Sequence, residues 1–157
     1  RVIESLPEYP FDHSCTYIPA GRLSRSFRFR EHKKLNLLGK PVVDWNPLQP
    51  RWRNFLKISE LPWVKDHKIN DTVIYPAVGV LVMAIEAANQ LSDPSRQIKG
   101  FKLTNTYFSV ALAIPDSAQG IETQMTFNPT NGGSNKNNTS WKFQLFSNEG
   151  AQWQEHS

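Results

Sequence analysis

The chain has 157 residues, enough for one domain with a buried core, and 39% of them are hydrophobic while 20% are charged, a balance typical of globular proteins. Cys15 is the only cysteine, which excludes an internal disulfide and a cysteine-cluster zinc site, so we expect no metal site. The formal net charge of +4 is concentrated in residues 22–34, which carry six Lys or Arg side chains and one Glu.

Residues 1–34 are predicted to be a linker that precedes the folded domain. The first 21 residues are rich in Pro, Tyr and small polar residues, as extended segments are. The first ten residues, RVIESLPEYP, do not show the basic and then apolar pattern of a secretory signal, so none is predicted. The longest apolar run, residues 76–88, is shorter than the ~20 residues that cross a bilayer. We therefore expect a cytoplasmic protein with no membrane association.

The basic residues 22–34, RLSRSFRFREHKK, are compatible with two interpretations. Arg side chains interleaved with Phe27 and Phe29 would bind phosphates and stack on the bases of a nucleic acid. The alternation also has the period of a β-strand, in which both Phe side chains face a core. We favour the strand and expect no nucleic-acid partner, because no nucleic-acid-binding motif accompanies the basic residues.

The folded domain is predicted to span residues 35–157. Pro76 precedes an apolar run that predicts a helix over about residues 77–91, since proline is well tolerated in a first helical turn. Alternating apolar side chains predict strands, most clearly on two faces: one formed by Ile121, Met125 and Phe127, the other by Trp141, Phe143 and Leu145. The predicted β runs are residues 50–59, 61–67, 97–115, 120–128, 140–148 and 151–156, with a hairpin loop over 128–140.

The predicted helix indicates the architecture. Its apolar residues, Val78 and Val82 among them, point in all directions, and only Glu86, Asn89 and Gln90 interrupt them. A helix that is apolar on all sides must be buried on nearly every side. The sequence therefore predicts an α+β protein with the hot-dog fold, in which an antiparallel β-sheet is wrapped around one long buried helix.

His67 lies in a polar bend nine residues before Pro76. Imidazole removes protons well near neutral pH. The first N–H groups of the helix, including those of Val78 and Gly79, lack intrahelical acceptors and favour a negative charge. The segment thus places a base next to donors for a developing oxyanion. A lone histidine in a bend is more often a surface residue, so these residues alone leave both interpretations open.

A family resemblance is carried by His67, Tyr75 and Pro76, which stand at the spacing of the H-x-x-x-G-x-x-x-x-P motif of polyketide and fatty-acid synthase dehydratases. The segments RFREHKKLNLLG, DWNPLQPRWRNFL, PWVKDH and YPAVGVLVMAIEAA resemble the linker and the N-terminal hot-dog lobe of fungal highly reducing polyketide synthases. The resemblance covers nearly the whole chain. It implies that the chain is one half of a double hot-dog dehydratase.

The resemblance also assigns roles to the motif residues. His67 is the implied catalytic base, and the implied substrate-binding residues are Tyr75, Pro76, Val78, Gly79 and Asp71. Asp71 stands where the motif has glycine, but Asp tolerates a left-handed turn better than most residues, so we expect the bend to survive. The other histidines, His13, His32 and His156, are expected to be structural or solvent-facing.

The implied reaction removes water from a β-hydroxyacyl thioester carried on the phosphopantetheine of an acyl carrier protein, with no cofactor in the domain. The leaving hydroxyl needs an acid, and no carboxylate of the chain is expected to be placed to give the proton, because the neighbouring Asp66 would face the opposite side of a strand from His67. The helix position that holds the acid in single-lobe relatives falls near Leu81, and Glu86 lies ~15 Å along the axis from Pro76. The resemblance therefore implies a second lobe that supplies an Asp, within a dimeric synthase that has other domains.

Three functions remain compatible with the residues. The first is the base-bearing lobe of a reducing synthase dehydratase. The second is a hot-dog lobe that Asp71 makes catalytically weak or inactive and that serves architecture or acyl binding. The third is a basic nucleic-acid-binding module.

Overall fold

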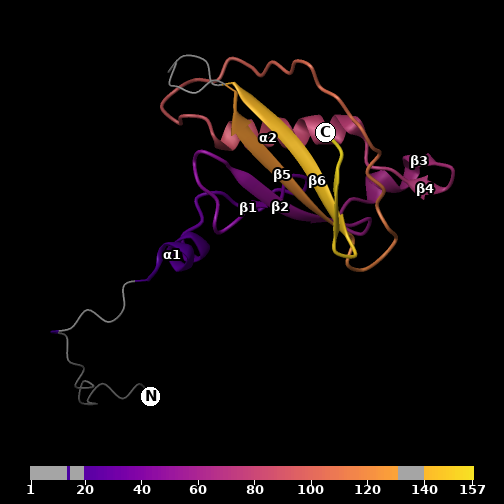
Figure 1. Cartoon of the computed structure of the whole chain (residues 1–157), viewed down its shortest axis with the longest axis horizontal. Coiled ribbons are helices and arrows are strands. Elements are labelled where there is room, and N and C mark those ends of the chain that lie inside the picture. Colours follow the sequence, from indigo (N-terminus) through magenta and orange to yellow (C-terminus); the bar gives the residue numbers. More distant parts are fainter. Residues whose placement is uncertain (1–13, 15–19, 131–139) are drawn as a thin grey trace, which may run out of the picture.

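The structure is a computed structural model that describes residues 14, 20–130 and 140–157. Most of the predicted linker, with His13 and Cys15, and residues 131–139 of the predicted hairpin loop lie outside the described residues. Figure 1 shows the elements, which in chain order are α1 (Arg22–Arg28), β1 (Lys40–Pro41), β2 (Arg51–Leu56), the 3-10 helix η1 (Pro62–Asp66), β3 (Lys68–Ile69), β4 (Thr72–Val73), α2 (Ala77–Gln90), β5 (Ile121–Pro129), β6 (Trp141–Glu149) and β7 (Gln152–Glu155).

The main sheet is antiparallel throughout and has the strand order β1-β2-β5-β6-β7. Trp52 of β2 faces Met125 of β5, which in turn faces Leu145 of β6, and all three side chains are fully buried. Alternate residues of a strand point to opposite faces, so one face of the sheet is the core face. This confirms the predicted strands over residues 50–59, 120–128, 140–148 and 151–156.

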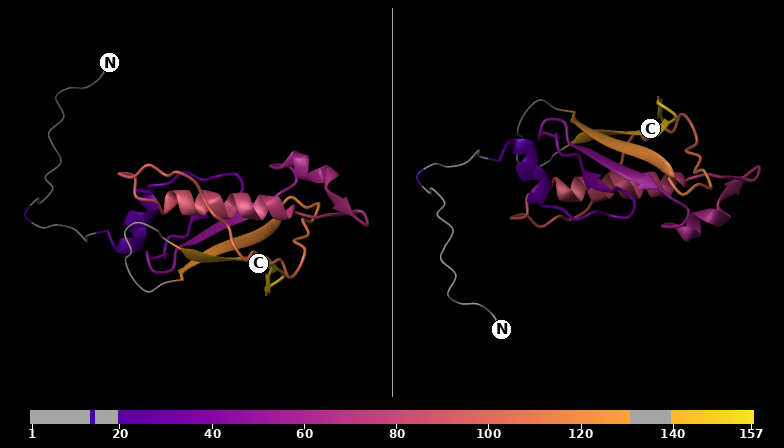
Figure 2. Two further views of the ribbon diagram at one scale, coloured as in Figure 1. Left: turned by 90° about the horizontal axis from the view of Figure 1, so that it is seen from above. Right: turned by 90° about the horizontal axis from the view of Figure 1, so that it is seen from below.

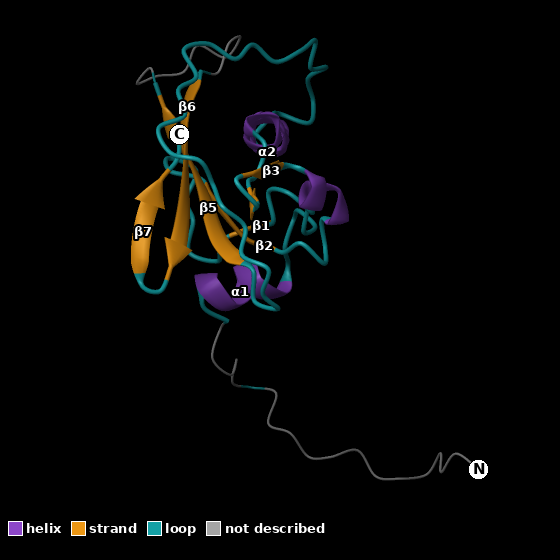
Figure 3. Cartoon of the chain, turned by 90° about the vertical axis from the view of Figure 1, so that its right-hand side faces the viewer, coloured by secondary structure: helices purple, strands orange, loops and turns teal. Residues whose placement is uncertain are grey.

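Helix α2 lies along the core face of the sheet (Figures 2 and 3). Its buried residues are Gly79, Val80, Met83, Ala84 and Ala87. The prediction that the helix is buried on nearly every side is wrong, because Val78 is 67% exposed and Val82 is 38% exposed. The sheet covers one side of the helix only, as the end-on view of α2 in Figure 3 shows. The uncovered side is an apolar stripe on the surface of this chain.

The polar residues of α2 serve the fold. Gln90 accepts a hydrogen bond from the indole N–H of buried Trp52 at 2.7 Å. The Glu86 carboxylate accepts the backbone N–H of Leu38 at 3.2 Å. Burial raises the pKa of the Glu86 carboxyl, and the Leu38 N–H offsets part of that increase because it stabilises the charged form. Glu86 thus fixes the segment before β1 to the helix.

Three predicted strands are wrong. Residues 22–28 form α1, and Phe27 and Phe29 are 62% and 78% exposed instead of facing a core. Straight-chain Arg side chains lose little freedom in a helix, and those in its last turn favour its negative end. Residues 62–66 form η1, which opens on a proline. Residues 97–115 contain only an isolated bridge, between Ala113 and Ile74.

No described helix has the length and apolar character needed to span a membrane.

Candidate active site

His67 lies at the junction between η1 and the hairpin formed by β3 and β4. Its backbone N–H donates to the carbonyl of Val64 at 3.0 Å, and its own carbonyl accepts the N–H of Ile74 at 3.0 Å. Val64 is fully buried and anchors η1 to the core. Figure 1 shows the hairpin beyond the N-terminal end of α2. The backbone of His67 is therefore fixed on both sides.

Ile74 also fixes the orientation of the His67 ring. Its Nδ1 lies 2.7 Å from the Ile74 carbonyl oxygen. A carbonyl oxygen only accepts, so Nδ1 carries the proton, and in the neutral ring Nε2 is left with a free lone pair. The backbone N–H of His67 is already bonded to Val64, so the ring supplies the second bond of the pair that residues 67 and 74 would exchange in an antiparallel ladder. The exposed ring thus presents its basic nitrogen outward.

The hairpin turn consists of Asn70 and Asp71, whose φ angles are 48° and 61°. Lys68 pairs with Val73 and Ile69 with Thr72, so two residues with positive φ close the loop, as in a type I′ turn. The expectation that Asp71 adopts a left-handed conformation is confirmed. The hydrogen bonds of the described residues place no bond between the Asp71 carboxylate and the His67 ring.

Replacing Asp71 by glycine is expected to change the free energy of unfolding by less than about 1 kcal/mol, because glycine adopts positive φ freely but loses more entropy on folding. The matched variant Asp71→Val should lower it by about 1–2 kcal/mol, since a β-branched residue is strained there. Urea denaturation measures both. Dehydration by a region containing both lobes should persist in Asp71→Gly, and a large loss of activity at unchanged stability would give the carboxylate a role of its own.

The start of α2 is packed through Tyr75 and Gly79. Tyr75 is 3% exposed, and its N–H donates to the Leu112 carbonyl at 2.7 Å. A Cβ on Gly79 would lie 2.7 Å from Cζ of the Tyr75 ring, so a larger residue at position 79 would have to displace that ring. The ring also lies 6.3 Å from that of Trp63 in η1. Tyr75 therefore packs η1, which ends next to His67, against the start of α2, which contains Val78.

One expectation for this end of α2 changes and another is kept. The Gly79 N–H is not a free donor, because it donates to the Pro76 carbonyl at 2.8 Å. Val78 lies in the first turn, where its N–H has no acceptor within the helix, and its side chain is exposed. The Tyr75 hydroxyl is buried without a hydrogen-bond partner among the described residues. Burial, helped by the negative charge of Glu86, raises the pKa of Tyr75 well above its usual range.

Gly79→Ala is expected to destabilise the chain by about 1–3 kcal/mol, because the added methyl overpacks the contact with the Tyr75 ring. The double variant Gly79→Ala with Tyr75→Leu should recover part of that loss, since the smaller side chain makes room for the methyl. Thermal denaturation of the three proteins measures the coupling. Equal destabilisation by Gly79→Ala with and without the second change would show that the two residues do not constrain each other.

Other ionisable residues are held elsewhere. The imidazole of His156 is buried between Ser147, whose hydroxyl oxygen lies 2.8 Å from Nε2, and the Val110 carbonyl, 3.0 Å from Nδ1. His156 is therefore structural, as expected. His67 lines neither the cavity beside His156 nor the one between α2 and β6. No group of three or more His, Cys, Asp or Glu side chains within the described ranges is placed to hold a metal ion.

The carbonyl of Ile74, which orients the imidazole of His67, could not be predicted from the sequence, because every residue has a backbone carbonyl. The contact between Tyr75 and Gly79 does have a signal, since residues four apart at the start of a helix lie on one side of it.

Comparison with known proteins gives a consistent family. Residues 36–148 match the model of the polyketide synthase dehydratase domain. Highly reducing polyketide synthase 40 of Fusarium mangiferae is 45% identical to this chain over 156 residues, which is 99% of the chain and 6% of that protein. Highly reducing polyketide synthase NEC1 of Pyricularia oryzae is 42% identical over 156 residues, again 99% of the chain and 6% of the relative.

Solved structures give the fold. The dehydratase domain from the CurK module of the curacin polyketide synthase aligns with a TM-score of 0.57 and 22% identity, covering 77% of this chain and 40% of that one. The domain from the terminal module of the rifamycin polyketide synthase gives 0.57 and 21%, over 77% and 39%. The predicted α+β hot-dog fold is confirmed. This chain is the N-terminal portion of a dehydratase domain and belongs to the polyketide synthase dehydratase family.

Proposed function

We propose that this chain is the base-bearing lobe of a dehydratase that converts a β-hydroxyacyl thioester into an α,β-enoyl thioester. The observation that carries the proposal is the hydrogen bond between Nδ1 of His67 and the Ile74 carbonyl, which in the neutral, exposed ring places the proton on Nδ1 and the lone pair on Nε2. A base held in one tautomer by a backbone carbonyl needs no reorganisation before it takes a proton.

The reaction assigns a task to each end of the site. Nε2 of His67 removes a proton from the α-carbon, the C–O bond at the β-carbon breaks, and the released electron pair forms the double bond. Negative charge gathers on the thioester oxygen, where the N–H of Val78 and the positive end of α2 stabilise it. The leaving oxygen takes a proton from an acid and departs as water.

We place the acid in a second hot-dog lobe, as an Asp. Within this chain the one carboxylate of α2, that of Glu86, is bonded to the backbone of Leu38 and has a structural role. The exposed stripe of α2 that contains Val78 and Val82 is the surface on which that lobe would pack. Residues 35–157 would then form one lobe of a double hot-dog, and residues 1–34 the linker before it.

The partners follow from the same proposal. The substrate is carried on the phosphopantetheine of an acyl carrier protein, the domain itself uses no cofactor, and the lobe works in the cytoplasm beside the other domains of a dimeric synthase. The alternative of a catalytically weak lobe rests on Asp71, and the turn that Asp71 completes counts against it. Family membership counts against the nucleic-acid alternative, although Phe27 in α1 and Phe29 just after it are exposed beside arginine residues.

The test is the reaction itself. The dehydratase region of the synthase, comprising this chain and the lobe that we propose to follow it, is mixed with a β-hydroxyacyl pantetheine thioester, and mass spectrometry follows the loss of water. An enoyl product that forms in proportion to enzyme supports the proposal. A region that binds the thioester without converting it, while its Asp71→Gly variant is active, would instead support the weak-lobe alternative.

A further inference from the structure

Ile74, whose carbonyl orients the His67 ring, is backed by residues 112–114 on its other side. Tyr75 donates its N–H to that segment at 2.7 Å, and Val73 accepts an N–H from it at 2.9 Å, so the two bonds flank Ile74. The bridge between Ile74 and the middle residue of the segment is antiparallel. Because the N–H and the carbonyl of Ile74 both bond to His67, the position of residues 112–114 fixes where that carbonyl lies.

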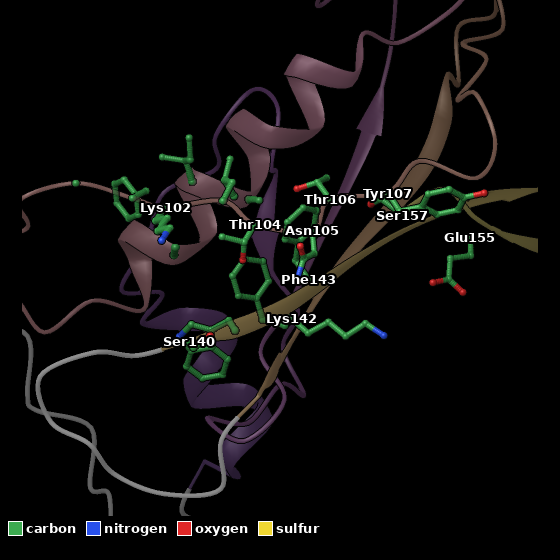
Figure 4. A pocket seen from close by; sticks show the side chains of 18 residues that line it. Lys102, Thr104, Asn105, Thr106, Tyr107, Ser140, Lys142, Phe143, Glu155 and Ser157 are labelled. Carbon is green, nitrogen blue, oxygen red and sulfur yellow. The ribbon is translucent and has the colours of Figure 1, made fainter.

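The chain just before residues 112–114 is bonded to the end of β7. Figure 4 shows Tyr107 near Ser157 and Glu155, where the chain leaves a cavity of about 670 Å³ that α2 and β6 also line. Directly after that point, the Ser109 N–H donates to the His156 carbonyl at 3.0 Å, and the Ser109 hydroxyl donates to the Glu155 carbonyl at 3.1 Å. The segment that backs Ile74 therefore starts from a contact with the main sheet.

The His156 side chain adds a second bond at this contact. Its Nδ1 lies 3.0 Å from the Val110 carbonyl oxygen, and its Nε2 lies 2.8 Å from the hydroxyl oxygen of Ser147 in β6. A carbonyl only accepts, so Nδ1 donates to Val110, and in the neutral ring Nε2 accepts the serine proton. His156 and Ser147 are each 4% exposed. The imidazole thus joins the core of the sheet to the backbone of Val110.

Hydrogen bonds fix residues 109–111 more than side-chain packing does. All three residues are exposed, Val110 by 45%, so their side chains contribute little to holding the segment. An apolar residue at position 156 would fill the same buried space but would leave the Val110 carbonyl free to turn. A directed N–H fixes that carbonyl, because a hydrogen bond weakens steeply as its angle closes. The imidazole therefore determines where residues 112–114 begin.

We propose that His156 is a positioning residue for the reaction, and that it acts on the base through residues 110–114 and Ile74. The Nδ1–H of His156 fixes the Val110 carbonyl, the backbone that follows pairs beside Ile74, and the Ile74 carbonyl orients His67. His156 itself contacts neither the substrate nor the reacting atoms. This inference rests on the proposed role of His67 as the base.

Two matched substitutions separate the two bonds of the His156 ring. His156→Asn keeps an N–H near the position of Nδ1 and therefore keeps the bond to the Val110 carbonyl. His156→Gln places its amide near the position of Nε2, toward Ser147, and loses the bond to Val110. Ser147→Ala removes only the bond to Nε2. Each variant disturbs the same buried site, so a loss of stability alone does not distinguish them.

A glycine inserted between Val110 and Ala111 tests the connection without changing a buried residue. The insertion lengthens an exposed part of the chain and leaves the His156 ring and its two bonds in place. If the contact acts through the backbone, the longer connection no longer transmits it, and the insertion should have the same effect as His156→Gln. This variant also serves where His156→Gln does not fold.

The tautomer of His67 is the measurement, because it reports the contact with Ile74 directly. Nitrogen NMR is recorded on the dehydratase region with both lobes, labelled in its histidines, at a pH of about 8.5, where imidazole is ordinarily neutral. His67→Asn identifies the His67 signals. Nδ1 of His67 should carry the proton in the unchanged protein, in His156→Asn and in Ser147→Ala. In His156→Gln and in the insertion, the proton should move largely to Nε2.

The rate provides a second measurement. His156→Gln should lower kcat for dehydration by about 10–10²-fold and leave KM unchanged, since a misplaced base slows the chemical step without weakening binding. An unchanged His67 tautomer in both His156→Gln and the insertion would overturn the proposal. So would a shift in Ser147→Ala as large as that in His156→Gln, which would indicate a general loosening of the core. The tautomer is read without turnover, so this test can fail or succeed independently of the proposed function.

Discussion

His67→Ala, in a dehydratase region that contains both lobes, is expected to slow dehydration by about 10²–10⁴-fold, the usual contribution of one general base. The alanine removes both the basic Nε2 and the Nδ1–H that bonds to the Ile74 carbonyl. Mass spectrometry of the carrier-bound product should show the β-hydroxyacyl thioester accumulating. A variant that stays within tenfold of the unchanged protein would remove His67 from the mechanism.

Two further variants separate the loss of the base from damage to the hairpin. His67→Asn keeps an N–H near the position of Nδ1 and has no basic nitrogen, so it should fold as well as the unchanged protein and remain inactive. His32→Ala changes a histidine in the segment before β1 and should leave the activity unchanged. If His67→Asn were active, the role of the ring would be structural.

The 157-residue chain alone is expected to show no useful dehydration of a β-hydroxyacyl pantetheine thioester, even when it is folded. His67 can take the α-proton, but hydroxide leaves poorly without a proton donor, and the Glu86 carboxylate is bonded to Leu38. The exposed stripe of α2 should also make the chain prone to self-association. Conversion is measured at equal concentrations of the short chain and of a polypeptide that includes the second lobe.

The longer polypeptide should restore turnover, because the second lobe buries the apolar stripe and brings an acid to the bound substrate. Sedimentation of the short chain at the assay concentration provides the control, since aggregation alone would also abolish activity. If a monomeric short chain matches the rate of the longer one, the acid lies within this chain and the division of the site between two lobes is wrong.

The parts of the fold that the sequence predicts are those whose signal is local. The apolar run after Pro76 predicts α2, and the alternation over residues 121–127 predicts β5, because each pattern is complete within its own element. Residues 22–28 have a strand-like pattern but form a helix, since no neighbouring strand competes with the helix preference of their arginines. Residues 97–115 fail for a related reason, because a strand needs a partner.

The candidate site, like the fold, could be predicted from the sequence only in part. The motif spacing locates His67, and the tolerance of Asp for positive φ predicts the turn at Asp71. The tautomer of the ring depends on a carbonyl, and the use of the Gly79 N–H by Pro76 depends on the geometry of one turn. Such details are fixed by backbone conformation, and side-chain identity does not encode them.

The way His67 is held has a consequence for recombining synthases. Among the described residues, its hydrogen-bond partners are Val64 and Ile74, the latter seven residues away. A crossover placed after Ser157 therefore transfers the base with its orientation intact, whereas one placed between residues 67 and 74 separates the ring from its acceptor. In a chimera that joins lobes from two different synthases, the first lobe alone therefore fixes the orientation of the His67 ring. If the site is divided as we propose, the contact that must be engineered is the packing of the second lobe along α2, because that contact would set the position of the acid.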